Sequence, residues 1–210
     1  MGYCMNLVIG SMEIVSLIVL LVVLYGHLFE TEMRHPKDRA YLHCIILALF
    51  GICADIPAWL LDGKTGIDSF LYIINLLSLV FGDLIAAAFA AYLYYIISNR
   101  IEISRMPFYI ISNINVASVA TMIIGCCFGK VFTILNGQII YLSMYPLTTI
   151  VGAVSLLFFV LIILKNAKVL GIHDTCVLLT YVLIPAIALV YEVFNPGASF
   201  IYILHYQYHY

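Results

Sequence analysis

The sequence predicts an all-α polytopic membrane protein, a bundle of six full transmembrane helices plus a truncated seventh, in a single sensor-like domain over residues 1–210. Three observations predict this class: 65% of the residues are hydrophobic, 10% are charged, and the mean hydropathy is +1.12. A soluble domain has about a quarter charged residues, whereas each membrane-spanning helix needs ~20 apolar residues. The composition therefore excludes a soluble enzyme, a nucleic-acid-binding protein and a disordered scaffold, and the net charge of −2 argues against a polyanionic partner.

Seven apolar segments follow one another along the chain. They cover residues 7–29, 40–61, 69–97, 107–128, 142–164, 175–193 and 199–210. No basic residue precedes the first segment, so it is predicted to be a span and not a cleavable signal peptide. The third segment is longer than a bilayer requires and is expected to tilt. The seventh is about half a span, so we expect it to be incomplete.

The charges in the loops predict the orientation, because Lys and Arg resist transfer across the membrane. Most of the basic residues fall in the first, third and fifth loops: Arg34, Lys37, Arg39, Arg100, Arg105, Lys165 and Lys168. The other two, Lys64 and Lys130, fall in the second and fourth loops. We therefore expect a multi-pass protein of the cell membrane with its N-terminus outside.

The fourth loop is predicted to be a short extracellular β-hairpin between the fourth and fifth helices. β-Branched and aromatic residues flank Asn136-Gly137 within the segment 131–141. Asn-Gly suits a type I′ turn, in which both central residues need positive φ. The alternative is an irregular loop. A hairpin here could lie over the helix ends as a lid.

One predicted helix start and two prolines within spans can be identified. Asp174 follows Gly171 and is predicted to be the N-cap of the sixth helix. Pro57 and Pro185 lie inside spans, where each leaves a carbonyl without its helical donor. A proline kink beside polar residues is typical of a binding cavity, and shaping of the bundle is the alternative.

Four acidic residues lie within the predicted membrane spans or at their edges. Glu13, Asp55, Asp83 and Glu192 fall within or at the edge of spans, and Lys and Arg are absent from the middle of every span. A charged group at the bilayer centre costs at least ~2.5 kcal/mol, so such residues are usually functional. The predicted orientation puts Asp83 near the middle of the membrane and the other three acids toward the outside.

Polar and aromatic residues near these acids predict an outward-facing cavity. Asp55, Trp59 and Asp62 follow the i, i+4, i+7 spacing of one helix face. The predicted ligand-binding residues are Glu13, Asp55, Trp59, Asn75, Asp83, Tyr141 and Glu192. Alternatives stay open: Trp59 suits an interfacial belt equally well, Asp62 suits a solvated loop better, and Glu192 suits the aqueous boundary.

The other reactive side chains carry no recognisable site. The cysteines form no CxxC or CxxH pattern, and the histidines are irregularly spaced, so we expect no metal and no cofactor. A retinal Schiff base needs a lysine within a span, which the sequence lacks. It also lacks a phosphate-binding loop, an HExxH motif and a GxSxG motif. We therefore expect no catalytic residues and no enzyme.

Several stretches share their order with one family. These are residues 12–30, the Asp55-x3-Trp59-x2-Asp62-Gly63 pattern, the Asn-Gly turn region, and the run from residue 171 to 202. In these features the chain resembles the N-terminal membrane region of clostridial-type GGDEF signalling proteins. That region is a seven-helix sensor module in front of a cytoplasmic diguanylate cyclase or, in related architectures, a histidine kinase.

The resemblance implies a receptor-like input module for an unknown small ligand. The sequence contains neither a GGDEF motif nor a kinase core, so we expect a fragment, a truncated product or a stand-alone form. The expected partners are the lipid bilayer, the ligand and, as one mode of assembly, a second copy in a homodimer, with no nucleic acid. The alternative function is a small membrane transporter or a substrate-binding transport subunit. A membrane enzyme ranks last.

Overall fold

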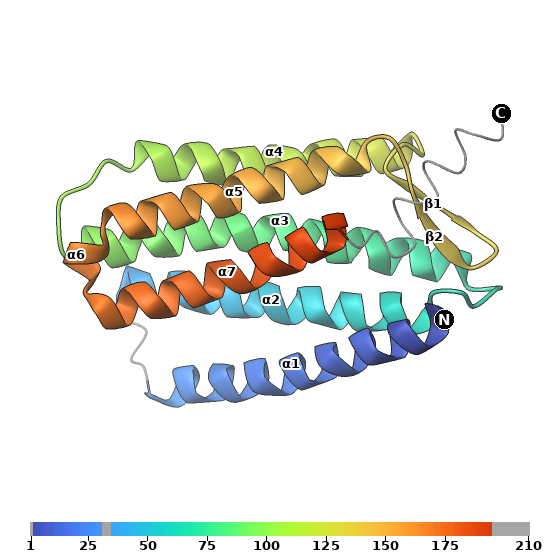
Figure 1. Ribbon diagram of the computed structural model, residues 1–210, viewed down its shortest axis with the longest axis horizontal. Helices are drawn as coiled ribbons and strands as arrows, with labels where there is room; N and C mark the ends of the chain where they lie inside the picture. Colours follow the sequence, from blue (N-terminus) through green and yellow to red (C-terminus); the bar gives the residue numbers. More distant parts are fainter. Residues whose placement is uncertain (1, 31–34, 195–210) are drawn as a thin grey trace.

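The fold is a bundle of long helices with one small hairpin. The structure, a computed structural model, describes residues 2–30 and 35–194, with side-chain surroundings over 13–29, 35–183 and 186. The elements are α1 (Gly2–Glu30), α2 (Pro36–Leu61), α3 (Asp68–Ser98), α4 (Met106–Cys127), β1 (Phe132–Leu135), β2 (Gln138–Tyr141), α5 (Tyr145–Lys165), α6 (Ala167–Leu170) and α7 (Ile172–Phe194). The long helices run side by side along the longest axis (Figure 1).

Two ends of the bundle differ in their elements (Figure 1). The hairpin end holds β1, β2 and the loop between α2 and α3. The basic end holds the loop between α3 and α4, the short helix α6 and the first turn of α7. In the predicted orientation the hairpin end faces outside and the basic end faces the cytoplasm.

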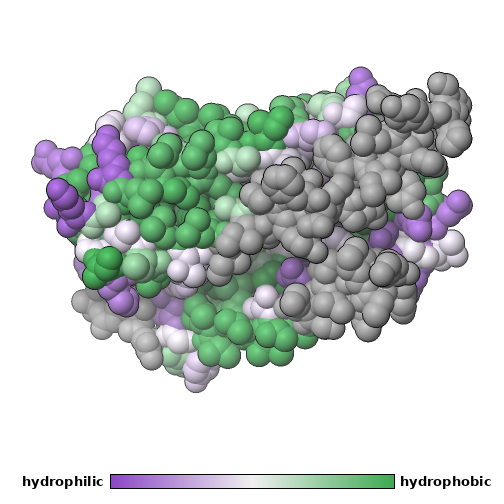
Figure 2. Space-filling view, viewed as in Figure 1, coloured by the Kyte–Doolittle hydropathy of each residue, from purple (hydrophilic) through white to green (hydrophobic). Residues whose placement is uncertain are grey.

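Four of the described helices, α2 to α5, are long and apolar enough to cross a membrane. Between 17% and 33% of each apolar stretch is buried inside the protein, so most of its side chains face outward, as in lipid. Figure 2 shows hydrophobic side chains over the middle of the visible surface and hydrophilic ones toward both ends. The chain is therefore an all-α protein of membrane type.

The predicted segments correspond to these helices to different extents. Segments 40–61, 69–97, 107–128 and 142–164 lie within or close to α2 to α5. Segments 7–29 and 175–193 are helical, as α1 and α7. The apolar parts described in those two helices, Glu13–Phe29 and Ile172–Leu183, are shorter than a full span, so six spans stay a prediction. The seventh segment, 199–210, lies outside the described residues.

Helix α3 is the centre of the packing. It contacts α2, α4, α5 and β1, whereas α7 packs chiefly against α5. Toward the basic end Leu93 and Ile97 of α3 are fully buried against Phe159 and Ile163 of α5 and Leu178 of α7. Because α3 runs from the hairpin end to the basic end (Figure 1), it physically connects the side chains at the two ends.

The prediction that Asp174 is an N-cap is wrong. Helix α7 begins at Ile172, and the Thr175 amide donates to the Gly171 carbonyl at 3.1 Å, so Asp174 lies inside the first turn. Its carboxylate pairs with Arg100 at the end of α3. The Arg100 guanidinium is a stronger partner for a carboxylate than a single amide is.

The hairpin is antiparallel and is attached to the loop between α2 and α3. Leu135 pairs with Gln138 across a turn in which Asn136 has φ of 54° and Gly137 has φ of 79°. The Gly63 amide donates to the Gly137 carbonyl at 2.8 Å, and the Ile139 amide donates to Asp62 Oδ1 at 3.1 Å. Asp62, for which a solvated position is expected, therefore holds β2.

We expect Gly137→Ala to lower the stability of the hairpin end. A Cβ at this position would lie 2.3 Å from the Lys64 carbonyl oxygen, and φ is positive, so alanine is strained and also clashes. Gly129→Ala is the matched control, because φ there is +61° and nothing lies within 4 Å of the added Cβ. Thermal unfolding in detergent should show the larger drop in Tm for Gly137→Ala. Equal drops would mean that the contact with Lys64 adds nothing.

Candidate functional site

Asp55 is the centre of one polar group near the hairpin end. The Trp59 indole N–H donates to Asp55 Oδ2 at 3.3 Å, and the Ser78 hydroxyl donates to Asp55 Oδ1 at 2.7 Å. Asp55 and Trp59 lie one turn apart on α2, and Ser78 reaches them from α3. Glu13 of α1 lies close enough for its carboxylate to interact electrostatically with Asp55. The structure thus brings three of the predicted residues together.

A second polar contact joins α3 to the hairpin. The Tyr141 hydroxyl donates to Asn75 Oδ1 at 3.4 Å, and the Tyr141 ring stacks on Tyr145 with centroids 4.0 Å apart. Asn75 is only 4% exposed, and its Nδ2 has no hydrogen-bond partner among the described residues. The amide N–H groups of Asn75 are therefore buried donors that the described residues leave unsatisfied.

Asp83 lies deeper, at the middle of α3. It is 7% exposed and lies beside Ser118 of α4, while its Oδ2 has no hydrogen-bond partner among the described residues. One turn along α4, the Asn115 amide donates to Ser155 Oγ of α5 at 2.8 Å, and both residues are fully buried. Polar side chains near the middle of the bundle thus link α3, α4 and α5.

The predicted site residues therefore lie at two levels. Asn75 and Asp83 are eight residues apart on α3, which places them about 12 Å apart along its axis. Asn75 lies beside the hairpin, and Asp83 lies at the centre of the bundle. Glu192 is part of α7, but its side chain lies outside the described surroundings.

Ser78 and Ser118 belong to this region and are missing from the predicted site. Ser78 follows Asn75 by three residues, and Ser118 follows Asn115 by three, so each shares a helix face with an asparagine. That spacing within apolar segments is a signal that could have found them. Their partners, Asp55 and Asp83, lie on other helices, and no local spacing indicates which helices touch.

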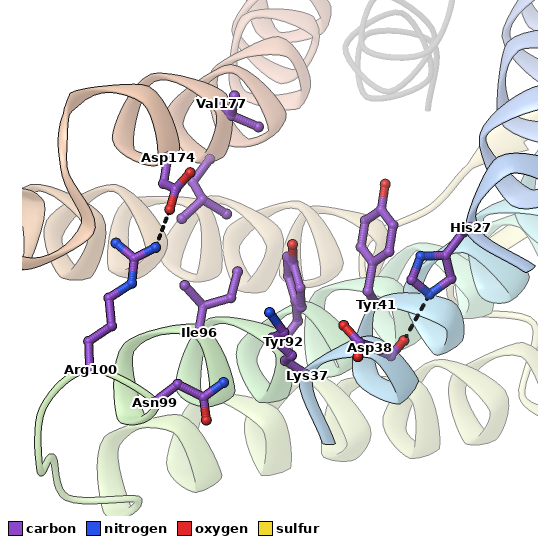
Figure 3. A pocket seen from close by; sticks show the side chains of 11 residues that line it. His27, Lys37, Asp38, Tyr41, Tyr92, Ile96, Asn99, Arg100, Asp174 and Val177 are labelled. Atoms are coloured by element: carbon purple, nitrogen blue, oxygen red, sulfur yellow. Dashed lines mark hydrogen bonds and ion pairs between the residues drawn. The ribbon is translucent and has the colours of Figure 1, made fainter. Parts of the chain in front are cut away.

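A pocket of about 370 Å³ lies at the basic end (Figure 3). This basic-end pocket is lined by His27, Lys37, Asp38, Tyr41, Tyr92, Ile96, Asn99, Arg100, Asp174, Val177 and Leu178. They come from α1, α2, α3, the residues just after α3, and α7. The sequence prediction placed no ligand-binding residue at this end, because the charges here also serve as the signal for membrane orientation.

Arg100 closes one side of the basic-end pocket. Its guanidinium donates to the Val169 carbonyl at 3.0 Å, to the Leu170 carbonyl, and to Asp174, with which it forms an ion pair. Asp174 lies in the first turn of α7, and hydrogen bonds from His173 and Arg100 lower the pKa of its carboxyl group. Arg100 therefore joins the end of α3 to α6 and to the first turn of α7.

Arg105, in the same loop region, has a different environment. Its Nε donates to the Tyr94 hydroxyl at 2.7 Å, and its guanidinium lies 5.2 Å from the centre of the Tyr94 ring. The hydrogen bond that Arg105 donates to Tyr94 raises the pKa of Arg105, which is exposed. Arg105 thus lies beside Tyr94 of α3 and Tyr109 of α4, whereas Arg100 joins the end of α3 to α6 and α7.

Comparison of the chain with models of protein families, with curated proteins and with solved structures finds no match. The resemblance to the membrane region of GGDEF signalling proteins therefore stays a prediction that depends on the motifs quoted for it. Within the part of the chain that the structure describes, no three His, Cys, Asp or Glu side chains are grouped as metal ligands.

Proposed function

We propose that the chain is a membrane-embedded sensory input module that binds a small ligand near the hairpin end and signals to a cytoplasmic output domain. One observation carries the proposal: Asn75 Nδ2 and Asp83 Oδ2 are buried on the same helix without a partner among the described residues. A buried polar atom without a hydrogen bond costs about 1–3 kcal/mol, which a bound ligand can offset. A purely structural asparagine or aspartate normally has its bonds satisfied.

The charges near this site favour a ligand that donates hydrogen bonds or is positively charged. Glu13, Asp55 and Asp83 are acidic, and the sequence has no Lys or Arg between Lys64 and Arg100, which includes all of α3. An ammonium group supplies both a charge and donors for carboxylate oxygens. A small organic ammonium ion is therefore the ligand class that these residues would bind best.

The finer topology is part of the same proposal. In it the N-terminus is outside, α1 and α7 also cross the membrane, and the hairpin covers the outer ends of α2 and α3 as a lid. The bonds from Gly63 and Asp62 to the hairpin, and from Tyr141 to Asn75, support this role. A ligand that bonded to Asn75 would displace or tighten the contact with Tyr141 and so move the hairpin.

Helix α3 would carry the signal. It bears Asn75, Ser78 and Asp83, and Arg100 just after its end joins α6 and α7. A ligand that binds one packing of α3 more tightly than another shifts the population between them. We call the contacts of Arg100 with α6 and α7 the Arg100 joint. These contacts would then change when a ligand binds near the hairpin end.

Trp59 gives a direct test, because it is the only tryptophan in the sequence and its indole N–H donates to Asp55. The full chain in nanodiscs is titrated with a panel of small ammonium ions, from methylammonium to spermidine, while the Trp59 emission is recorded. We expect at least one ion to give a saturable shift, because it would compete for or polarise the Asp55 carboxylate.

Asp83→Asn separates ligand binding from a local effect on Trp59. The Trp59 indole bonds to Asp55 and not to Asp83, so this variant should keep the resting emission and weaken the titrated shift about tenfold or more. Asp68→Asn, at the exposed start of α3, is the matched control and should leave the titration unchanged. If no ammonium ion gives a saturable shift, or if Asp83→Asn and Asp68→Asn behave alike, the proposed site is wrong.

A transporter is the second candidate, and Pro57 favours it. Pro57 lies inside α2 two residues from Asp55, and interrupted helices with buried acids line the substrate paths of transporters. Uptake of the same ammonium ion by proteoliposomes distinguishes the two functions. A sensory module binds the ion without transporting it, so saturable uptake that Asp83→Asn abolishes would favour transport.

A further inference from the structure

The basic-end pocket is lined by one ion pair and by two further residues of opposite charge, Lys37 and Asp38. Arg100 and Asp174 are paired with each other. His27 Nε2 contacts the backbone carbonyl of Asp38 at 3.3 Å, which leaves the Asp38 carboxylate out of that bond. Figure 3 shows these residues around the pocket, with Lys37 and Asp38 on α2 and Asp174 on α7.

Lys37 and Asp38 are half-buried, and neither charged group has a hydrogen bond or ion pair among the described residues. Because neighbouring residues on a helix do not face each other, the two side chains are not arranged to neutralise one another. Partly buried charges without partners are unfavourable, and a ligand that matches both would relieve each of them. Asn99 and Tyr92 line the same space with further polar groups.

We propose that the basic-end pocket binds a zwitterion that has a primary ammonium group and an oxyanion, as in the phosphoethanolamine group. The ammonium would hydrogen-bond to Asp38, and the oxyanion would lie at Lys37. The charged residues that line the pocket balance in sign, Lys37 and Arg100 against Asp38 and Asp174, which favours a zwitterion over a simple anion. A volume of about 370 Å³ suits a headgroup-sized ligand, since ligand pockets span about 300–1,000 Å³.

Two sources could supply this chemistry. Large apolar side chains are exposed on two helices that line the pocket: Leu28 and Phe29 of α1 are 50% and 74% exposed, and Val177 of α7 is 42% exposed. Acyl chains of a phospholipid could lie along them while the headgroup occupies the pocket. A soluble phosphoethanolamine compound has the same headgroup without the chains, so the two sources can be compared directly.

Native mass spectrometry of the full chain released from detergent micelles measures this binding. The chain is mixed with dioleoyl phosphatidylethanolamine, with dioleoyl phosphatidylglycerol, or with glycerophosphoethanolamine. We expect phosphatidylethanolamine to be retained more than phosphatidylglycerol, because only its ammonium can bond to Asp38. Competition by glycerophosphoethanolamine at equal concentration would identify the soluble compound as the source, and its failure to compete would identify the lipid.

Variants locate the site. Asp38→Asn and Lys37→Gln should each weaken retention about tenfold, whereas Asp38→Glu should restore it because the carboxylate is kept. Glu102→Gln and Lys168→Gln are matched controls, because both residues are exposed at the same end and are absent from the lining of the pocket. Equal retention of phosphatidylglycerol, or equal losses in the pocket and control variants, would overturn the proposal.

Discussion

Phe132→Ala is expected to cause the largest loss of stability at the hairpin end, about 3–5 kcal/mol. The Phe132 ring is completely buried, lies 4.7 Å from the Tyr72 ring, and packs with Met122, Cys126 and Val131. Its removal leaves a cavity between the hairpin, α3 and α4, which the surrounding side chains cannot fill without moving. Thermal unfolding in detergent micelles measures the effect as a drop in Tm.

The same variant links the hairpin to the proposed site. Phe132 pairs with Tyr141 in the hairpin, and Tyr141 bonds to Asn75, so a loosened hairpin should also weaken the ammonium-induced shift of Trp59 emission. Phe128→Ala is the matched control, because Phe128 is 73% exposed and lies in the same loop region. If both variants lose the same stability, packing of Phe132 does not hold the hairpin.

Arg100→Ala is the second substitution with a large expected effect. It removes two hydrogen bonds to the carbonyls of Val169 and Leu170 together with the ion pair to Asp174. Bonds to a charged donor contribute about 1.5–3 kcal/mol, and the lower part of this range applies because the Arg100 side chain is 40% exposed. Hydrogen exchange should become faster in α6 and in the first turn of α7.

Two comparisons make the Arg100 result specific. Arg105→Ala removes an equal charge at the same end together with its interactions with Tyr94 of α3 and Tyr109 of α4, so exchange in α6 should stay unchanged. Arg100→Lys keeps the charge but not the planar fork that reaches three acceptors, so it should resemble Arg100→Ala. If the lysine variant behaves as the wild type, charge alone accounts for the joint.

The pH dependence of the Arg100 joint follows from Asp174. Because the pKa of Asp174 is lowered in the folded protein, by His173 and by Arg100, its carboxylate stabilises the folded state fully above its ordinary pKa of about 3.9. This contribution is lost as the pH falls through the lowered folded pKa. In a His173→Asn variant, which keeps the ion pair between Arg100 and Asp174 but has no imidazole, exchange rates in α6, corrected for the intrinsic effect of pH, should therefore stay constant between neutral pH and about pH 5. A change in that range would contradict the role given to Asp174.

The sequence alone predicts the helical membrane class because apolar length is a local property. Segments such as 40–61 and 142–164 need no knowledge of their neighbours to be recognised as helices that can cross a bilayer. The contact between Asp55 and Trp59 is also local, since it joins positions one turn apart on α2.

Contacts between helices are the part that the sequence does not predict. Ser78 reaches Asp55 and Ser118 reaches Asp83 only because α2, α3 and α4 have a particular register. Asp62 is a typical solvated loop residue by its position, yet the hairpin, more than 70 residues later, supplies its partner. These pairs are set by tertiary packing, which single-chain spacing does not encode.

The basic-end pocket illustrates a different difficulty. Lys37 and Arg100 are two of the basic residues that indicate membrane orientation, and this role accounts for them without any binding site. Only the packing of α1, α2, α3 and α7 shows that both line one pocket. Asp174 illustrates a similar difficulty, because its position just after Gly171 suits an N-cap. A longer-range partner, Arg100, takes its carboxylate instead.

Coupling between the two ends is the central claim, and hydrogen-exchange mass spectrometry tests it most directly. The full chain in nanodiscs is compared with and without a saturating amount of the ammonium ion that shifts Trp59 emission most. We predict that exchange changes in residues 167–174, around the Arg100 joint, and that Asp83→Asn abolishes this change. If exchange changes only at the hairpin end, or changes equally in Asp83→Asn, the ligand does not signal along α3.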